Sequence, residues 1–74
     1  MEYNLTNFGI ILQNERKKKG LSQEKLAEIA DLHRTYISDL ERGVRNPTIT
    51  TIFTLCKALN TTPTELLKGF ENGK

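Results

Sequence analysis

Apolar residues recur at intervals of three and four along the chain, and no stretch alternates apolar and polar residues as a half-buried β-strand does. This spacing predicts an all-α protein. Residue types that begin or end helices divide the pattern into five short segments. The predicted helices run from about residue 6 to 19, from 23 to 30, from about 33 to 43, from 49 to 59 and from 63 to about 68.

Capping residues stand at the boundaries of these segments. Ser22 and Thr48 are of the types preferred at helix N-caps, and Gly20 and Gly43 are natural residues for left-handed helix ends. The last segment opens with TTPTELL, in which Thr62 is the N-cap, a proline follows at the first helical position, and a glutamate stands three residues after the cap. This is the pattern of a capping box.

The length of 74 residues allows one domain, residues 1–74, with a core over about residues 6–68 and a frayed tail over residues 69–74. A chain of this size is too small to enclose a deep substrate cavity, so a binding module is favoured over an enzyme. Eleven Lys and Arg against nine Asp and Glu give a formal net charge of +2 and a pI near 8.9, which suits an anionic partner.

Cysteine content and hydropathy indicate the compartment. The single cysteine, Cys56, excludes an internal disulfide and fits a reducing environment. The first residues, MEYNLTNFGI, lack the basic and then apolar run of a secretory signal, and no segment approaches the roughly 20 apolar residues that span a bilayer. We therefore expect a soluble, cytoplasmic protein with no membrane partner.

The second and third predicted helices are joined by only two or three residues, so they must cross at a steep angle. Ala27 is a small residue on the inner side of the second helix, where the two backbones approach. Leu32 and Ile37 occupy the N′ and N4 positions of the third helix, the pair that forms a hydrophobic staple. With Ile37 and Leu40 facing inward, a polar face remains at the N-terminal half of the third helix. That face consists of Arg34, Thr35, Ser38 and Asp39.

The segment LSQEKLAEIADLHRTYISDL, residues 21–40, resembles the helix-turn-helix of the lambda-repressor-like (Cro/C1-type) DNA-binding family, whose usual phrasing includes GLSQEKLA, ISDLERG and NPTI. The resemblance covers roughly residues 8–67 and implies a compact five-helix bundle with the helix-turn-helix at helices two and three. Within the family, RTYIS, LERG and RNPT are most similar to the controller proteins of restriction-modification systems. Asp31 stands where many relatives have glycine, so the turn is either less tightly left-handed or uses the tolerance of aspartate for that conformation. Glu15 stands where leucine is frequent, which leaves the packing of that side open.

A helix-turn-helix places the first residues of its second helix against base edges in the major groove. Arg34 is the strongest candidate because a guanidinium can bond guanine O6 and N7 together, the alternative being an ion pair with Asp39 or Asp31. Tyr36 either packs at the helix edge or extends its hydroxyl to a phosphate or base. Asp39 accepts from cytosine N4, holds Arg34, or disfavours wrong DNA sites by repelling phosphates. The expected base contacts are Arg34, Thr35, Tyr36, Ser38 and Asp39.

Contacts to the DNA backbone are expected from a second set of residues. Gln23 begins the second helix, where free N–H groups and the helix dipole favour a phosphate. His33 is a poor N-cap and makes more sense as a phosphate donor, with a solvent-facing histidine as the alternative. The expected backbone contacts are Gln23, His33, Arg42, Arg45, Asn46 and Thr48. The resemblance also implies that Arg16 and Glu41 form an internal ion pair and do not touch DNA.

Dimerisation is a further expectation, because one module reads too few base pairs to find a site in a genome. Such proteins pair on half-sites about 34 Å apart. The fourth helix has more apolar residues than one core-facing stripe requires, which favours an isologous interface over the alternative of filling the hollow between helices four and five. The expected interface residues are Ile49, Phe53, Leu67 and Phe70.

The resemblance thus implies a sequence-specific transcription regulator, most like a controller protein that binds a pseudo-palindromic operator in double-stranded DNA as a homodimer. It would adjust its own synthesis and that of a neighbouring endonuclease gene, with RNA polymerase as a further partner if it activates. The alternatives are a phage-type repressor, the antitoxin of a toxin pair and a helical protein-interaction module. The sequence has one His and one Cys, and it contains no carboxylate pair, Gly-rich phosphate loop or metal-ligand spacing. We therefore expect no catalytic residue, metal or cofactor.

Overall fold

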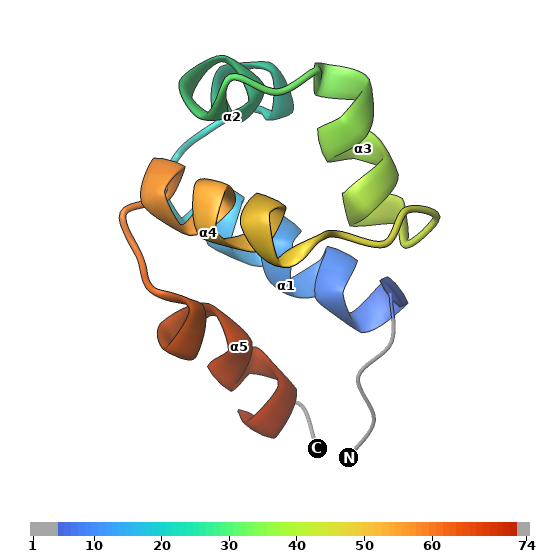
Figure 1. Cartoon of the computed structure of the whole chain (residues 1–74). Coiled ribbons are helices and arrows are strands. Elements are labelled where there is room, and N and C mark those ends of the chain that lie inside the picture. The colour runs from blue at the N-terminus through green and yellow to red at the C-terminus, as the bar shows by residue number, and fades with distance from the viewer. Residues whose placement is uncertain (1–4, 73–74) are drawn as a thin grey trace.

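The computed structural model describes the backbone of residues 5–72 and the side chains of residues 7–68, and this part of the chain forms five helices and no strand. The predicted all-α fold and the predicted order of helices are confirmed. The helices are α1 (Leu5–Lys18), α2 (Gln23–Ala30), α3 (Arg34–Arg42), α4 (Ile49–Ala58) and α5 (Pro63–Asn72) (Figure 1).

The helices are arranged around α1. It packs against α3 and α5, while α4 packs against α2 and α5. Figure 1 shows α2 and α3 together at one end of the bundle and α5 at the opposite end from α2. The helix-turn-helix pair therefore occupies its own end of the molecule.

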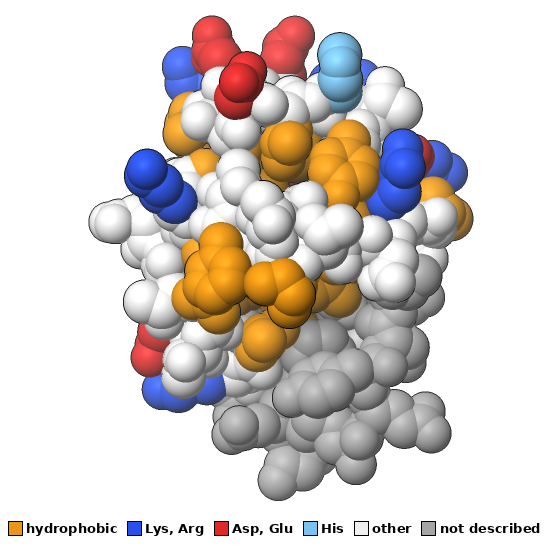
Figure 2. Space-filling view, viewed as in Figure 1, with side chains coloured by type: hydrophobic (Ala, Val, Ile, Leu, Met, Phe, Trp, Pro, Cys, Tyr) orange, Lys and Arg blue, Asp and Glu red, His pale blue; other side chains and the backbone are white. Residues whose placement is uncertain are grey.

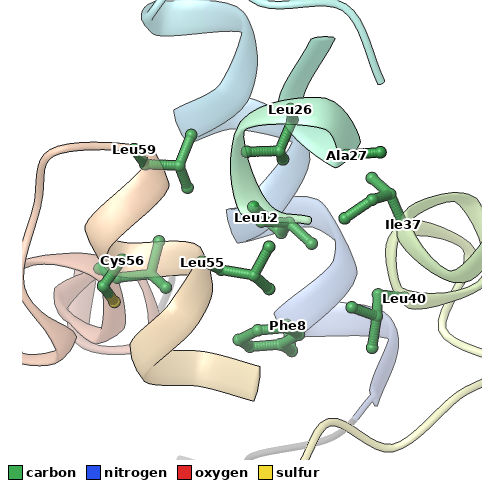
Figure 3. Packing of buried hydrophobic residues seen from close by; sticks show 11 residues of the cluster. Phe8, Leu12, Leu26, Ala27, Ile37, Leu40, Leu55, Cys56 and Leu59 are labelled. Atoms are coloured by element: carbon green, nitrogen blue, oxygen red, sulfur yellow. The ribbon is translucent and has the colours of Figure 1, made fainter. Parts of the chain in front are cut away.

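The hydrophobic core lies where α1 meets the surrounding helices. In Figure 3, Leu12 of α1 lies among Leu26 of α2, Ile37 of α3 and Leu55 of α4, and all four are fully buried. Full burial of one such side chain contributes roughly 1.5–3 kcal/mol, so these contacts hold the helices at fixed positions. The fully buried large side chains are Leu12, Leu26, Ile37, Leu40, Leu55 and Leu59.

The predicted N-caps are confirmed. The hydroxyl oxygens of Ser22, Thr48 and Thr62 each accept a hydrogen bond from the backbone N–H three residues later, at 3.0, 3.0 and 3.1 Å. Each cap satisfies an N–H that has no partner within its helix and contributes about 1 kcal/mol. Glu65, the other member of the predicted capping box, places its carboxylate 3.0 Å from Nζ of Lys68.

The predicted glycine stops are also confirmed. Gly20 and Gly43 have φ of 74° and 78° and follow α1 and α3. This left-handed conformation costs glycine little, because glycine has no Cβ. Beyond Gly43, the N–H of Val44 donates to the carbonyl of Asp39 at 3.1 Å and so closes the end of α3.

The C-terminal helix is longer than the sequence predicted. The expected core ended at about residue 68 with a frayed tail over 69–74, whereas α5 continues as a helix to Asn72; residues 73 and 74 lie outside the described part. A glycine inside a helix costs only about 1 kcal/mol, so Gly69 does not stop a helix that the Thr62 cap has already started.

A three-residue link, residues 31–33, joins α2 to α3, and Figure 1 shows the two helices crossing instead of lying antiparallel. Asp31 has φ 58° and ψ 45°, so of the two alternatives the turn uses the tolerance of aspartate for the left-handed region. The N–H of Leu32 then donates to the carbonyl of Ala27 at 2.9 Å. Ala27 is itself buried, as expected of a small residue at a close helix crossing.

Candidate nucleic-acid interface

The N-terminal half of α3 presents polar side chains outward. Arg34 and Thr35 are the first two residues of the helix and are exposed, while Ile37 and Leu40 of the same helix are fully buried. The buried Ile37 and Leu40 fix the rotation of α3 about its axis. Arg34 and Thr35 are therefore the side chains that a partner bound at the N-terminal end of α3 would meet first. Ser38, one turn further along, is half-buried.

The structure corrects one alternative considered for Asp39. Its carboxylate contacts the guanidinium of Arg42, at 2.5 Å, and not that of Arg34. Asp39 and Arg42 are three residues apart, a spacing at which side chains on a helix meet, whereas Arg34 lies five positions before Asp39. Within residues 7–68 no ion pair joins Arg34 to either Asp31 or Asp39, and Arg34 stays a predicted base contact together with Thr35, Ser38 and Asp39.

Tyr36 links α3 to the start of α4. Its side chain is half-buried, and its hydroxyl lies 3.1 Å from Oγ1 of Thr51. The guanidinium of Arg45 stands over the tyrosine ring, 5.0 Å from its centroid, within the range of a cation–π contact. The packing role considered for Tyr36 is therefore present, and the predicted contact of its hydroxyl with DNA remains a prediction.

The contact of Thr51 with Tyr36 could not be predicted from the sequence. It stands three residues after the Thr48 cap, and a threonine there has no pattern that predicts a partner on another helix. The available signal is only that both Tyr36 and Thr51 carry hydroxyls next to buried positions.

A shallow hollow of about 450 Å³ lies beside this contact. It brings together a cation, an imidazole and two hydroxyl-bearing side chains, with one carboxylate at its edge. An anionic partner suits most of these groups. The hollow is lined by Asp31, Leu32, His33, Thr35, Tyr36 and Arg45.

The predicted backbone contacts lie at the start of α2, on the link before α3, at the last residue of α3 and in the loop after it. His33 is the N-cap residue of α3, is exposed, and makes no capping hydrogen bond with its ring, so both ring nitrogens remain available. Arg42, Arg45 and Asn46 are exposed near the other end of α3. Their contacts with DNA stay predictions.

Two further predicted backbone contacts already have partners inside the protein. The side-chain amide of Gln23 donates to Oε1 of Glu41 at 3.0 Å. The hydroxyl of Thr48 accepts from the N–H of Thr51 and donates to Oγ1 of Thr51, both at 3.0 Å. A phosphate at either position would have to use the donor or acceptor capacity that these bonds leave free.

The ion pair implied between Arg16 and Glu41 is present. Nε of Arg16 lies 2.7 Å from Oε2 of Glu41, and Nη2 lies 3.0 Å from Oε1. The side chains are 9% and 2% exposed, and the remaining guanidinium nitrogen Nη1 donates to the carbonyl of Leu21 at 2.8 Å. With Gln23 also bound to Glu41, one buried carboxylate ties together α1, the start of α2 and the end of α3.

The backbones of α1 and α3 approach closely beside this network. A Cβ added at Gly9 would lie 2.3 Å from the carbonyl oxygen of Glu41 and 2.7 Å from that of Leu40. Only glycine fits such an approach without a shift of one helix. The sequence offered no turn or cap to single out this glycine.

The predicted dimer residues fall into three situations. Ile49 and Phe53 of α4 are 69% and 58% exposed, and Figure 2 shows hydrophobic side chains gathered over α4 in the middle of the viewed face. Leu67 is only partly exposed and packs against the core, as in the alternative of a filled hollow between α4 and α5. The side chain of Phe70 lies outside the described residues.

Cys56 is a buried free thiol, and its pKa is raised by burial and, secondarily, by the negative charge of Glu15. The packing of Glu15 was left open by the sequence; its carboxylate lies 3.8 Å from Nζ of Lys19.

Within the described part of the chain, no cluster of three His, Cys, Asp or Glu side chains has the geometry of a metal site. No helix between residues 5 and 72 has the length and apolar character to cross a membrane.

Two crossed helices, a buried inner face and an exposed polar N-terminal half of the second helix define a helix-turn-helix. Residues 12–66 match the helix-turn-helix family, and the chain belongs to its lambda-repressor-like branch of DNA-binding regulators.

Among its relatives are several controller proteins. The chain is 49% identical over 63 residues to the control protein C.SmaI of Serratia marcescens. The matched region covers 82% of this chain and 75% of that protein. The restriction-modification controller protein C.AhdI from Aeromonas hydrophila has a similar structure, with a TM-score of 0.81, 45% identity, and coverage of 84% of this chain and 94% of that one. The controller protein C.Esp1396I, crystallised as a tetramer with its natural 35 base-pair operator, is similar at a TM-score of 0.87 and 30% identity, over 97% of this chain and 95% of that one.

Proposed function

We propose that this chain is the controller protein of a restriction-modification system and binds operator DNA as a homodimer. The observation that carries the proposal is the exposed polar start of α3, held in place by the fully buried Ile37 and Leu40 on its opposite side. The similarity to C.SmaI and C.AhdI supports the controller subtype.

In the proposed complex α3 lies in the major groove with its N-terminus leading. Arg34 then reads a guanine through O6 and N7, and Thr35 offers a hydroxyl and a methyl to the neighbouring base. His33 and the exposed loop after α3 bind phosphates on either side, which fixes the register of the helix without reading sequence.

The homodimer is proposed to form through α4. Ile49 and Phe53 are large apolar side chains exposed next to each other on one helix, and such a patch marks a surface that another protein covers. Two copies related by a two-fold axis would present two α3 helices to two half-sites about one helical turn apart.

The proposal extends to regulation. Bound near its own promoter, the dimer would adjust its own synthesis and that of a neighbouring restriction endonuclease gene. An endonuclease and a methyltransferase encoded beside the chain are the expected genomic setting, and their absence would count against the controller subtype while leaving DNA binding intact.

The direct experiment measures fluorescence anisotropy of labelled duplexes that tile the DNA upstream of the chain's own gene. Tight binding to one duplex and weak binding to its neighbours is expected, with log affinity falling linearly against log salt at a slope of about −0.9 per phosphate neutralised. Equal affinity for every duplex would overturn sequence-specific regulation, and no binding at low salt would leave a protein-interaction module as the better description.

A further inference from the structure

Arg34 and Arg42 stand at opposite ends of α3, in opposite electrostatic surroundings. Both are exposed, Arg34 as the first residue of the helix and Arg42 as the last. Arg34 lies at the positive end of the helix dipole, and no ion pair joins it to a carboxylate within residues 7–68. Arg42 lies at the negative end, which favours a cation, and its Nη2 lies 2.5 Å from Oδ1 of Asp39. In this part of the chain the charge of Arg34 is therefore uncompensated, whereas the charge of Arg42 is compensated within the helix.

The Asp39 carboxylate is more enclosed than those of the other described ion pairs with the same spacing along a helix. Its side chain is 20% exposed, whereas the side chains of Glu28 and Glu65, which pair with lysines three residues away, are 71% and 61% exposed. Water and salt screen the attraction between exposed charges, and they screen partly enclosed charges less. We therefore expect Asp39 to hold Arg42 more persistently than the two exposed glutamates hold their lysines.

Asp39 lowers the free energy that Arg42 can gain from a DNA phosphate. If the guanidinium turns from the carboxylate to a phosphate, Asp39 is left without its partner beside a second anion, and like charges repel. If the guanidinium stays, the carboxylate cancels most of its positive charge, and the pair attracts a phosphate only weakly. Neither obstacle applies to Arg34, because no carboxylate pairs with it in the described residues. The two arginines of one helix should therefore contribute unequally to the binding of an anion.

We propose that Asp39 withholds Arg42 from DNA phosphates and so limits the affinity of the protein for DNA of any sequence. This inference rests on the proposed function, and it gives the two residues this role in place of the base contact and the backbone contact expected of them from the sequence. Phosphate contacts strengthen binding to every site alike, and a genome offers about 10⁶–10⁹ competing sites. A regulator with one phosphate contact fewer in each subunit is retained less on DNA outside its operator.

The proposal is tested by a double-mutant cycle with Asp39→Asn, Arg42→Gln and the two combined. Each change removes one charge and keeps a polar side chain. Anisotropy measures the affinity of each protein from about 50 to 200 mM salt, because the slope of log affinity against log salt counts the phosphates that the protein neutralises. The probes are the upstream duplex that wild-type protein binds most tightly and a duplex of scrambled sequence. Urea unfolding and sedimentation of each variant establish that fold and association state are unchanged.

We expect Asp39→Asn to release Arg42 to a phosphate. The slope should then become steeper by about 0.9 for each subunit, or about 1.8 for a dimer on two half-sites, and it should do so on both duplexes. Arg42→Gln should leave the slope at the wild-type value, because it removes a cation that contacts no phosphate. The double variant should also have the wild-type slope, because the cation that Asp39→Asn would release is absent. Glu65→Gln, which breaks an ion pair of the same spacing on α5, is the matched control and should leave the slope unchanged.

Three results would overturn this inference and leave the proposed function intact. A slope less steep by about 0.9 per subunit for Arg42→Gln would mean that Arg42 binds a phosphate while it is paired. An equal increase in slope from Asp39→Asn in the presence and in the absence of Arg42 would mean that Asp39 acts by repulsion alone. An unchanged slope for Asp39→Asn would mean that no cation is withheld, and weaker binding of only the tightest duplex would then show that Asp39 contacts a base. Wild-type protein that binds neither duplex would remove the proposed function and this inference together.

Discussion

Arg34 is the residue on which sequence discrimination is expected to depend. It stands exposed at the first position of α3, and Asp39, one turn away, already pairs with Arg42. In the proposed complex its guanidinium would therefore enter the groove without first breaking an ion pair to that carboxylate. A forked donor in this position matches the two acceptors of guanine, a geometry that lysine cannot reproduce.

Arg34→Ala should cost about 1–3 kcal/mol of binding free energy and relax discrimination at one base position in each half-site. The measurement is the affinity for operator duplexes substituted one base pair at a time. Arg45→Ala serves as the comparison, since a phosphate or minor-groove contact should weaken binding with less change in preference. If Arg34→Ala weakens binding equally for every duplex, Arg34 binds phosphate.

Cys56 should make stability depend on alkaline pH. Its pKa is raised in the folded protein by burial and by the charge of Glu15, so the unfolded chain loses the thiol proton first. The contribution of the thiol to stability is complete below the unfolded pKa of about 8.5 and is lost as pH rises through the folded pKa.

The free energy of unfolding should therefore fall more steeply for the wild type than for Cys56→Ala as pH rises above the unfolded thiol pKa of about 8.5, as measured in urea. Other titrating groups contribute to both proteins alike, so the difference in slope isolates the thiol. Parallel curves would contradict the predicted shift.

At the scale of elements, the joint between α1 and α3 sets the position of the recognition helix. Gly9 allows the two backbones to approach, and the Arg16–Glu41 pair connects them about two turns further along α1. The buried pair alone is weak evidence for stability, because removing charges from water costs about as much as their attraction returns. Its more important effect is to fix one end of α3 relative to α1 and to the start of α2.

Gly9→Ala should destabilise the fold by about 1–3 kcal/mol, the usual cost of overpacking. The added Cβ would meet backbone carbonyls of α3, which cannot move aside as the end of a flexible side chain can. Urea unfolding measures the change, with Asn14→Ala at an exposed position of the same helix as the control. Equal stability of the two variants would show that α1 and α3 can separate at little cost.

At the scale of the whole molecule, α4 is expected to decide the association state. Phe53→Asp places a charge in the patch that Ile49 and Phe53 expose, and it should convert the proposed dimer to monomers in sedimentation velocity. Ile10→Asp is the matched control, because Ile10 is a similarly exposed apolar residue on α1, at 50% exposure. A dimer that survives Phe53→Asp would place the interface elsewhere.

The sequence predicts the parts of this fold that depend on near neighbours. Helix caps and stops depend on hydrogen bonds between residues only a few positions apart. This applies to the N-caps Ser22, Thr48 and Thr62 and to the helix end at Gly43. The helical spacing likewise predicted the inward side of α3. The end of α5 was misplaced because a helix end without a strong stop signal depends on small differences in propensity.

Contacts between distant residues were harder to predict. Tyr36 meets Thr51 only because the loop between α3 and α4 returns the chain to a particular place, and Gln23 meets Glu41 only because α2 crosses α3. Neither contact produces a spacing of apolar or polar residues that could be recognised in the sequence. The ion pair of Arg16 and Glu41, across a similar separation, was anticipated through resemblance to a family and not through spacing.

The anchoring of α3 at both ends has a thermodynamic consequence. Glu41, in the last turn of α3, binds side chains of α1 and α2. Tyr36, in the first turn of α3, contacts a side chain of α4. We expect a helix held in this way to enter a DNA groove as a rigid body, with little loss of ordering entropy on binding. Calorimetry should accordingly find a heat-capacity change no larger than the apolar area covered at the interface accounts for, and a markedly more negative value would reveal folding coupled to binding.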